Sequence, residues 1–558
     1  MSAEIKVFKN ASLKPFDHHS DAFAISGQDV VAVGSWSELQ NLVTSQTQVI
    51  DCEGATVIPG IEDSHLHGYM LGRQLSGANI SPEHCADLAA IHRKLREHAS
   101  LNPGWVRGFG WVGGVIEGTG PKSTLTHKEL EDAQINEPII LTDFSGHQAW
   151  CNKKALDAAG ITANTKDPAG GQIVRNSLGE PTGLLLESAV KLVTQVMPRP
   201  TRSEITNAVI RARDILLANG ITSFTDPGLG PGAASLDDGT ASLEVVDVYK
   251  QLAKDDELNL RIEVMLLYGG LGGTSIADVK TGLEEFGPPE IRSRGYQVTV
   301  SQLKVFADGI PRSRTSWMSQ PYDTHTHGSL TLAGSNEKEQ VETLHSIYRY
   351  ATTNGWQIGI HATGDETISA ITDAAEQNSA GIKFRNYVIH ADFIKPADMA
   401  RMASAGLGIN TQPGIRRMVG RAVEPMLGQE STLRRERLRD MQSAGVSLAL
   451  SSDAPVTPAD WRVIFASAVD RGFINEPDFD DGQGLTALEA MHALTITAAY
   501  QSHSEQWRGS IEPGKVADFV VLDRLVDWDG DPWQVTKAKP RAVFVGGKLV
   551  HGLSLIHI

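Results

Sequence analysis

The stretch PGIEDSHLH, residues 59–67, places His65 and His67 two positions apart at the end of an apolar run. Alternate residues of an extended strand point to the same face of a sheet, so both imidazoles are expected on one side of the chain. Neutral imidazole is a common zinc ligand, and the spacing therefore indicates a metal site at a strand end. Taken alone, the pattern also fits a pair of exposed or packed core histidines.

Beyond this stretch, short apolar runs alternate with amphipathic helical patterns, for example over residues 203–219 and 338–353. Such alternation predicts an α/β protein with a parallel sheet, and eight units predict a closed (β/α)8 TIM barrel. An open, doubly wound sheet is the alternative. The eight apolar runs are residues 56–61, 221–225, 260–267, 298–306, 357–360, 387–389, 407–409 and 447–450.

Both ends of the chain and one long connection fall outside this pattern. Short strands near the two ends are predicted to pair into a small β-sandwich domain made of residues 1–58 and 509–558. The barrel then comprises residues 59–508. Its first two strands are separated by far more chain than the dozen or so residues that a crossover requires, so residues 72–202 are interpreted as an inserted subdomain. Because the insertion leaves the carboxyl end of the first strand, it is expected to cover the barrel mouth.

Several later strands contain, or lead to, residues of types found in metal sites. The fourth predicted strand contains Lys304, and the eighth leads to Asp453. The fifth and sixth strands lead to His361 and His390. In a barrel, the carboxyl ends of all strands converge on one mouth, where active sites lie. We therefore expect these side chains to meet the two histidines of the first strand, although each of them taken alone also has a structural explanation.

Eight segments, in order along the chain, form a recognisable set: PGIEDSHLH (59–67), SGHQAW (145–150), GLLLE (183–187), LKVFADG (303–309), HATGD (361–365), IHA (389–391), SDAPV (452–456) and GSIEPGKVAD (509–518). With these segments the chain resembles the amidohydrolase superfamily of metal-dependent hydrolases. Within it, the chain is similar to the YtcJ-like, or amidohydrolase 3, branch, which includes N-substituted formamide deformylases. The set is specific for the superfamily and uninformative about the substrate.

The resemblance implies a distorted TIM barrel with a binuclear metal centre of two zinc ions, other divalent metals being alternatives. The implied ligands are His65 and His67 on one ion, His361 and His390 on the second, Lys304 as a bridging, CO2-derived carboxylate, and Asp453 on the first ion. A lysine ammonium cannot ligate a cation, whereas burial beside metals favours the neutral amine, which can take up CO2. An ion pair inside the barrel is the alternative for Lys304.

The reaction implied by the resemblance is hydrolysis of a C–N bond in an amide, N-formyl or carbamate group by a metal-activated hydroxide. Asp453 would handle the proton, and His147 of the insertion would bind or polarise the substrate. An ester or lactone hydrolase, a mononuclear deaminase and a non-catalytic regulatory homologue are the alternatives. Mononuclear deaminases have a glutamate three residues after the histidine of the fifth strand, where this chain has Gly364, and Lys304 also disfavours that reading.

Three further residues are predicted to contact a small-molecule substrate. Arg312 and Arg314 follow the fourth strand, where the family usually has small residues, and a guanidinium suits a two-pronged contact with a carboxylate. Trp111 is predicted to line an aromatic pocket. Asp392 also departs from the family pattern, because an amide side chain is more usual at that position.

The composition narrows the classes of partner. The 558 residues have a formal net charge of −17, which disfavours unspecific binding to nucleic acid or anionic membranes. No run approaches the ~20 apolar residues of a membrane span, no secretory signal is visible, and the three cysteines form no CxxC pair, so a cytoplasmic location is predicted. A homo-oligomer, a dimer, is expected. The arginine pairs at 416–417 and 434–435 are interpreted as solvated charges, and the LSLIHI tail (553–558) is assigned no function.

Overall fold

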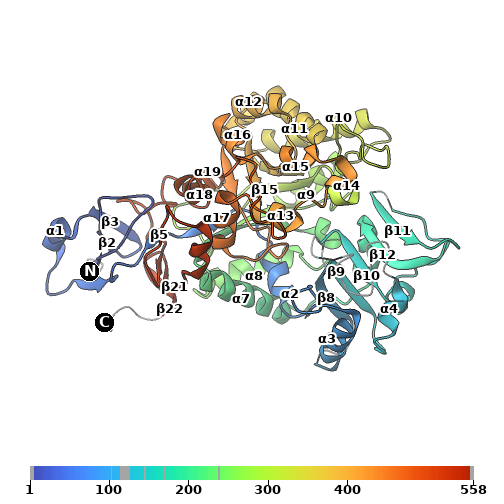
Figure 1. Ribbon diagram of the computed structural model, residues 1–558, viewed down its shortest axis with the longest axis horizontal. Coiled ribbons are helices and arrows are strands. Elements are labelled where there is room, and N and C mark those ends of the chain that lie inside the picture. Colours follow the sequence, from blue (N-terminus) through green and yellow to red (C-terminus); the bar gives the residue numbers. More distant parts are fainter. Residues whose placement is uncertain are drawn as a thin grey trace.

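The computed structural model describes residues 5–101, 104–112, 126–143, 146–168, 170–236 and 239–552. The LSLIHI tail, Ser145 and the first four residues lie outside the described residues. Figure 1 shows a β domain that contains both ends of the chain, a central barrel, and the inserted subdomain on the opposite side of the barrel. Within the described ranges, no helix is both long and apolar enough to cross a membrane.

The predicted (β/α)8 TIM barrel is confirmed. Eight parallel strands lie in the order β19-β18-β17-β16-β15-β14-β13-β6. Their side chains are almost entirely buried, as expected where strands are covered on the outside by helices and filled on the inside by packed residues. The strands are β6 (Ile61–Asp63), β13 (Ile221–Leu229), β14 (Arg261–Leu266), β15 (Val298–Phe306), β16 (Gln357–Ala362), β17 (Tyr387–His390), β18 (Gly408–Thr411) and β19 (Leu448–Leu450).

Helices return the chain from the mouth of the barrel to its base. The first of them begins at Arg202 because Thr201 and Glu204 form a capping box, in which each side chain binds the backbone N–H of the other. The outer helices are α7 (Arg202–Ala218), α8 (Leu243–Lys254), α9 (Ile276–Phe286), α10 (Glu337–Thr353), α11 (Asp365–Gln377), α12 (Pro396–Ser404), α16 (Leu438–Ser443) and α17 (Trp461–Val469).

The first predicted barrel strand, residues 56–61, is in fact two strands. Its first part, β5 (Val57–Pro59), pairs with β20 (Phe519–Leu522) in the β domain, and only β6 belongs to the barrel. The two parts meet at Gly60, where a Cβ atom would lie 2.2 Å from Oγ1 of Thr222. Glycine therefore lets the chain pass from one sheet to the other at a point where no side chain fits, and a continuous apolar run conceals this break.

The barrel closes between β6 and β19 through bonds just beyond the two strands. The amide of Ser452 donates to Oδ1 of Asp63 over 3.0 Å, and the amide of Asp453 donates to the carbonyl of His65 over 2.9 Å. The amide of His67 donates to the carbonyl of Ala454 over 2.9 Å. These bonds hold the loop after the last strand against the loop after the first, which brings residues nearly 400 positions apart into one site.

The β domain consists of two four-stranded sheets, β3-β2-β1-β4 and β22-β21-β20-β5. Phe8 and Phe23 stack at 4.7 Å, Phe519 and Phe544 stack at 4.5 Å, and edge contacts join the two pairs. This shared aromatic core ties the two ends of the chain together. The remaining strands are β1 (Ile5–Lys9), β2 (Ala22–Ser26), β3 (Asp29–Gly34), β4 (Gln48–Asp51), β21 (Pro540–Val545) and β22 (Lys548–Gly552).

The insertion forms its own six-stranded sheet, in the order β11-β12-β10-β9-β8-β7. Helices α3 (Leu88–Leu101), α4 (His127–Glu131) and α5 (Lys153–Ala158) accompany it. Trp111 and Trp150 lie at the centre of one of its apolar clusters. Its strands are β7 (Ala78–Asn79), β8 (Val106–Trp111), β9 (Ile139–Asp143), β10 (Gln148–Cys151), β11 (Gly171–Arg175) and β12 (Pro181–Glu187).

A buried ion pair joins the barrel to the β domain, and its loss is expected to destabilise the protein. Nε and Nη2 of Arg261 donate to the two carboxylate oxygens of Asp518 over 2.6 and 3.0 Å, and both side chains are buried. Asp518→Asn would leave the guanidinium charge unpaired, at a cost of about 3–5 kcal/mol in the free energy of unfolding. Chemical denaturation followed by circular dichroism measures this change.

A matched control comes from the exposed pair of Asp29 and Arg294, which joins the same two parts of the molecule. Asp29→Asn is expected to change the unfolding free energy by no more than about 1 kcal/mol, because water screens this pair. Equal effects of the two substitutions would show that burial of the Arg261 pair does not matter.

Candidate active site

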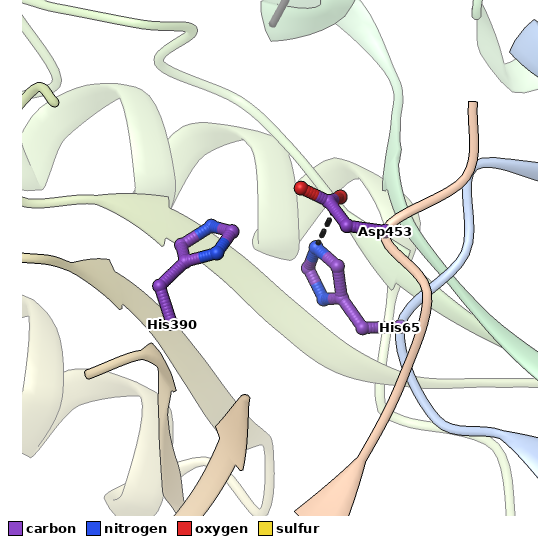
Figure 2. Close-up of side chains that lie close together, drawn as sticks. All are labelled: His65, His390 and Asp453. Carbon is purple, nitrogen blue, oxygen red and sulfur yellow. Dashed lines mark ion pairs between the residues drawn. The ribbon is translucent and has the colours of Figure 1, made fainter. Parts of the chain in front are cut away.

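The spacing of His65 and His67 predicts a position on a strand, but the structure places both in the loop between β6 and α2 (Gly68–Gln74), because β6 ends at Asp63. Their side chains still converge. Nε2 of His65 lies 3.2 Å, and Nε2 of His67 lies 3.3 Å, from Oδ1 of Asp453. Figure 2 shows the Asp453 carboxylate beside the His65 ring, with His390 facing them. One ligand atom from each of His65, His390 and Asp453 lies within 4.8 Å of the others.

Hydrogen bonds determine which nitrogen of His361 and of His390 keeps a lone pair. Nε2 of His361 lies 3.1 Å from the carbonyl oxygen of Gly309, which only accepts, so Nε2 carries the proton and Nδ1 the lone pair. Nδ1 of His390 donates to Oε1 of Gln412 over 2.7 Å, which leaves the lone pair on Nε2. The centroids of the two rings are 4.5 Å apart, so both histidines belong to one site.

Lys304 lies on β15 and is 1% exposed. Burial lowers the pKa of its ammonium to about 7, so a large share of the side chain is a neutral amine at physiological pH. Its Nζ lies 4.6 Å from the centroid of the Phe306 ring and has no hydrogen-bond partner among the described residues. The alternative of an ion pair inside the barrel is not supported, because the described residues provide no salt-bridge partner within 4.0 Å of Nζ.

The other members of the cluster have the protonation states that metal binding requires. Burial lowers the pKa of His65 and of His361 well below the usual range, and lowers that of His390 to about 4. Burial acts to raise the pKa of Asp453, but hydrogen bonds with His65 and His67 outweigh it and hold that pKa well below its usual range. At neutral pH these three histidines are therefore neutral imidazoles, and Asp453 is an ionised carboxylate.

This donor set fits a divalent metal. Two ligand atoms that bind one zinc ion at about 2.0–2.1 Å are roughly 3 Å apart. The distances of 3.2 and 3.3 Å from Oδ1 of Asp453 to the two histidine nitrogens agree with that separation. Nδ1 of His361 and Nζ of Lys304 are buried and unpartnered within the described part of the chain, as expected of atoms that await a ligand. Nitrogen and carboxylate donors suit zinc and the neighbouring transition metals.

Two of these residues have strained backbones. His390 has φ +71° and Asp453 has φ +56°, in the left-handed region that side chains other than glycine seldom adopt. Such conformations cost about 1–3 kcal/mol each and are concentrated at functional sites. Both side chains line the cavity at the barrel mouth.

The inserted subdomain supplies His147 to the same cluster. Its ring centroid lies 5.8 Å from that of His361 and 6.5 Å from that of Phe306. Nδ1 of His147 lies 2.7 Å from Oε2 of Glu187, and both side chains are buried. Burial acts to lower the pKa of His147, but the Glu187 charge and hydrogen bond outweigh it and raise that pKa. A residue of the insertion thus lies beside the ligands of the barrel.

A cavity opens above the cluster, and the side chains that line it beyond the ligands are largely apolar. An apolar lining of this kind suits the organic part of a small-molecule ligand. The apolar lining includes Met70, Leu236, Phe306, Ile310, Ile415 and Val456.

Of the three predicted substrate-binding residues, only Arg312 lines this cavity. Arg314 is instead held by the protein itself, since its Nε and Nη2 donate to the two carboxylate oxygens of Asp323 over 2.6 and 2.9 Å. Trp111 is buried against Trp150 in the core of the insertion, where its Nε1 donates to the carbonyl of Leu141. The interpretation of Trp111 as a pocket residue is therefore corrected: it is a packing residue.

Other residues of the site escape detection in the sequence. Arg435 is 4% exposed, lines the cavity and binds the Asp392 carboxylate over 3.0 Å, so the interpretation of this arginine as a solvated charge is wrong. The pair also explains the departure at Asp392, whose charge Arg435 neutralises. Gln412 and Glu187 orient His390 and His147. Glu187 is the last residue of the family segment GLLLE, and this segment is the one feature of the sequence that could have indicated a functional role for it.

Comparisons with known proteins agree with this geometry. The model of the family described as "Amidohydrolase family" matches residues 48–551. The putative amidohydrolase YtcJ of Bacillus subtilis is 26% identical, and the alignment covers 96% of this chain and 95% of that protein. The N-substituted formamide deformylase of Arthrobacter pascens is 27% identical, with 92% of each chain covered.

A solved structure shows the same fold. The uncharacterized metal-dependent hydrolase from Pyrococcus horikoshii has a TM-score of 0.73 at 22% identity, with 98% of this chain and all of that chain covered. The family match spans most of the sequence, and side chains that could bind a metal gather at the barrel mouth: the chain belongs to the amidohydrolase family and is similar to its YtcJ-like branch.

Proposed function

We propose that this member of the amidohydrolase family hydrolyses a C–N bond in an amide, N-formyl or carbamate group of a small molecule. The observation that carries the proposal is the convergence of His65 and His67 on Asp453, beside the buried amine of Lys304 and beneath an apolar cavity. The relative from Arthrobacter pascens is named an N-substituted formamide deformylase, which supports an N-formyl group among the candidates.

The residues that would hold the metals are His65, His67 and Asp453 for one ion, His361 and His390 for a second, and Lys304 between them. The neutral amine of Lys304 would attack the carbon of CO2, form an N–C bond and release a proton, which gives the anionic oxygen ligand that an amine cannot provide. Two bound zinc ions would lower the pKa of a water molecule and polarise the scissile carbonyl.

Protein groups would perform the remaining steps. The Asp453 carboxylate is ionised, and it would accept the proton of the attacking water and return it to the leaving nitrogen. His147, which lines the cavity from the insertion, would bind the substrate. The apolar lining would hold the organic part of the substrate and exclude bulk water.

The structure offers no support for the deaminase alternative. A side chain at residue 364 would collide with the backbone of Trp317, since a Cβ atom there would lie 2.1 Å from its carbonyl oxygen. The two acids that follow are engaged elsewhere. Asp365 binds the amide of Ser319 over 2.8 Å, and Glu366 pairs with Lys395 over 2.7 Å.

A substrate screen with controlled metal content tests the proposal. Zinc-loaded protein is assayed with an N-formyl amine, an N-acyl amine, a carbamate and an ester, and the released amine, ammonia or alcohol is measured. We expect amine release from at least one C–N substrate, its loss after dialysis against a chelator, and its return with Zn2+. Alcohol release from the ester alone, ammonia as the only product, or amine release unaffected by the chelator would each contradict the proposal.

A further inference from the structure

The pair of Glu187 and His147 has a geometry that packing alone does not explain. Glu187 is 6% exposed, yet the described residues give its carboxylate no lysine or arginine partner; its ion pair is with Nδ1 of His147 at 2.7 Å. Burying a carboxylate without a fixed cation is costly unless its hydrogen bonds are well formed. The cost indicates that the role of this carboxylate is to hold the His147 imidazole in place.

The backbone around Glu187 fixes this arrangement. Glu187 is the last residue of β12, and its amide donates to the carbonyl of His147 over 2.8 Å, so the two residues are joined by backbone as well as by side chain. Its φ of +52° lies in the left-handed region. A strained conformation is kept where surrounding contacts hold it, and here it directs the carboxylate toward the imidazole.

Glu187 also touches the barrel. Oγ1 of Thr315 lies 3.5 Å from Oε1 of Glu187, and Thr315 belongs to the loop that follows β15, which also contains the cavity residue Arg312. The chain at Gly309 also passes nearby, because a Cβ atom added there would lie 3.5 Å from the same oxygen. The carboxylate therefore sits at the junction of the insertion with the barrel, and not within the core of either part.

The orientation of the imidazole follows from these contacts. The ring of His147 lines the cavity, whereas Glu187, which holds Nδ1, does not. The edge that contains Nε2 is therefore the one on the cavity side. A carboxylate that accepts a hydrogen bond from Nδ1–H fixes the tautomer and the orientation of an imidazole and leaves the lone pair on Nε2.

We propose that Glu187 is a positioning residue, which fixes the His147 imidazole of the insertion so that Nε2 faces the reacting group of the substrate. The inference rests on the proposed function, and it makes the insertion part of the machinery that binds the reacting group. A general acid–base group that is held rigidly in this way contributes about 100-fold or more to turnover.

The test compares Glu187→Gln, His147→Gln and the double variant, each loaded with zinc, on an N-formyl amine. We expect each single substitution to lower kcat by about 100-fold while KM changes less than about threefold and zinc content stays at the wild-type level. The double variant is expected to be no slower than His147→Gln, since residues that act as a unit are not additive. Glu180→Gln, an exposed acid on the same hairpin, is the control and should match the wild type.

A readout that needs no substrate separates the failure of this inference from the failure of the proposed function. In proton NMR, the Nδ1–H of His147 is expected as a low-field signal that His147→Gln removes and that Glu187→Gln shifts to higher field. If the wild type hydrolyses no C–N substrate but the signal behaves in this way, the proposed function fails and the positioning role stands. An unchanged signal in Glu187→Gln, additive losses in the double variant, or loss of zinc from Glu187→Gln would overturn the inference.

Discussion

Asp453→Asn is expected to lower kcat by at least about 1000-fold, with little change in fold or thermal stability. The substitution keeps the volume of the side chain but removes the charge that His65 and His67 approach at 3.2 and 3.3 Å. An amide is both a weaker ligand for a divalent cation and a poor proton acceptor, so a metal ligand and the proton carrier are lost together. Steady-state kinetics on a C–N substrate and elemental analysis of the purified variant measure the two effects.

Asp323→Asn provides the control for this experiment. Asp323 is a partly exposed acid that binds Arg314 on the loop after β15, outside the cavity lining, and its removal is expected to leave kcat within about twofold. Turnover at the wild-type rate in Asp453→Asn would show that this carboxylate neither binds a metal nor moves a proton in the reaction.

Lys304→Gln is expected to reduce the metal content from two ions to at most one and to lower kcat by about 100-fold or more. The amine at this position is buried and is unpartnered in the described part of the chain. Its pKa of about 7 leaves a large share of it neutral at physiological pH, and the neutral amine is the form that reacts with CO2. Glutamine retains a polar side chain of similar length but cannot form the bridging carboxylate. Lys304→Met, which matches the length and is compatible with burial, checks that any loss does not arise from misfolding.

Carbon-13 NMR after incubation with labelled bicarbonate tests the modification itself. The wild type is expected to show a carbamate carbonyl signal that both Lys304 variants lack. Lys250→Gln, at a half-buried lysine paired with Glu290 away from the cavity, should retain both the signal and the activity. Two bound ions in Lys304→Gln, or no carbamate signal in an active wild type, would contradict the bridging role.

The barrel could be predicted from the sequence because its strands are buried on both faces and appear as continuous apolar runs. The run over residues 298–306 matches β15 at both ends. The exception is the first strand, where Gly60 lets the chain leave the β domain for the barrel. Periodicity cannot reveal such a break, because residues 56–61 form one short apolar run and both strands are buried.

The sequence predicts that the candidate ligands lie together because the carboxyl ends of barrel strands converge on one mouth. This rule of topology requires no knowledge of side-chain contacts. The finer parts of the site depend on pairings between distant segments. His361 presents Nδ1 only because the carbonyl of Gly309 takes its other nitrogen, and Arg435 reaches the cavity only because Asp392 neutralises it. Trp111 is the opposite case: the sequence predicts a pocket residue, but the side chain packs in an apolar cluster of the insertion.

The central claim is that the barrel mouth holds divalent metal ions. The proposed ligands are His65 and His67 of the loop after β6, Lys304 on β15, His361 on β16, His390 on β17 and Asp453 beyond β19. The most direct measurement is anomalous X-ray diffraction at the zinc edge from crystals of zinc-loaded, active protein. We predict a strong peak between Nε2 of His65, Nε2 of His67 and Oδ1 of Asp453, and a second peak near Nδ1 of His361 and Nε2 of His390. Active protein whose crystals show no anomalous peak among these atoms would contradict the claim.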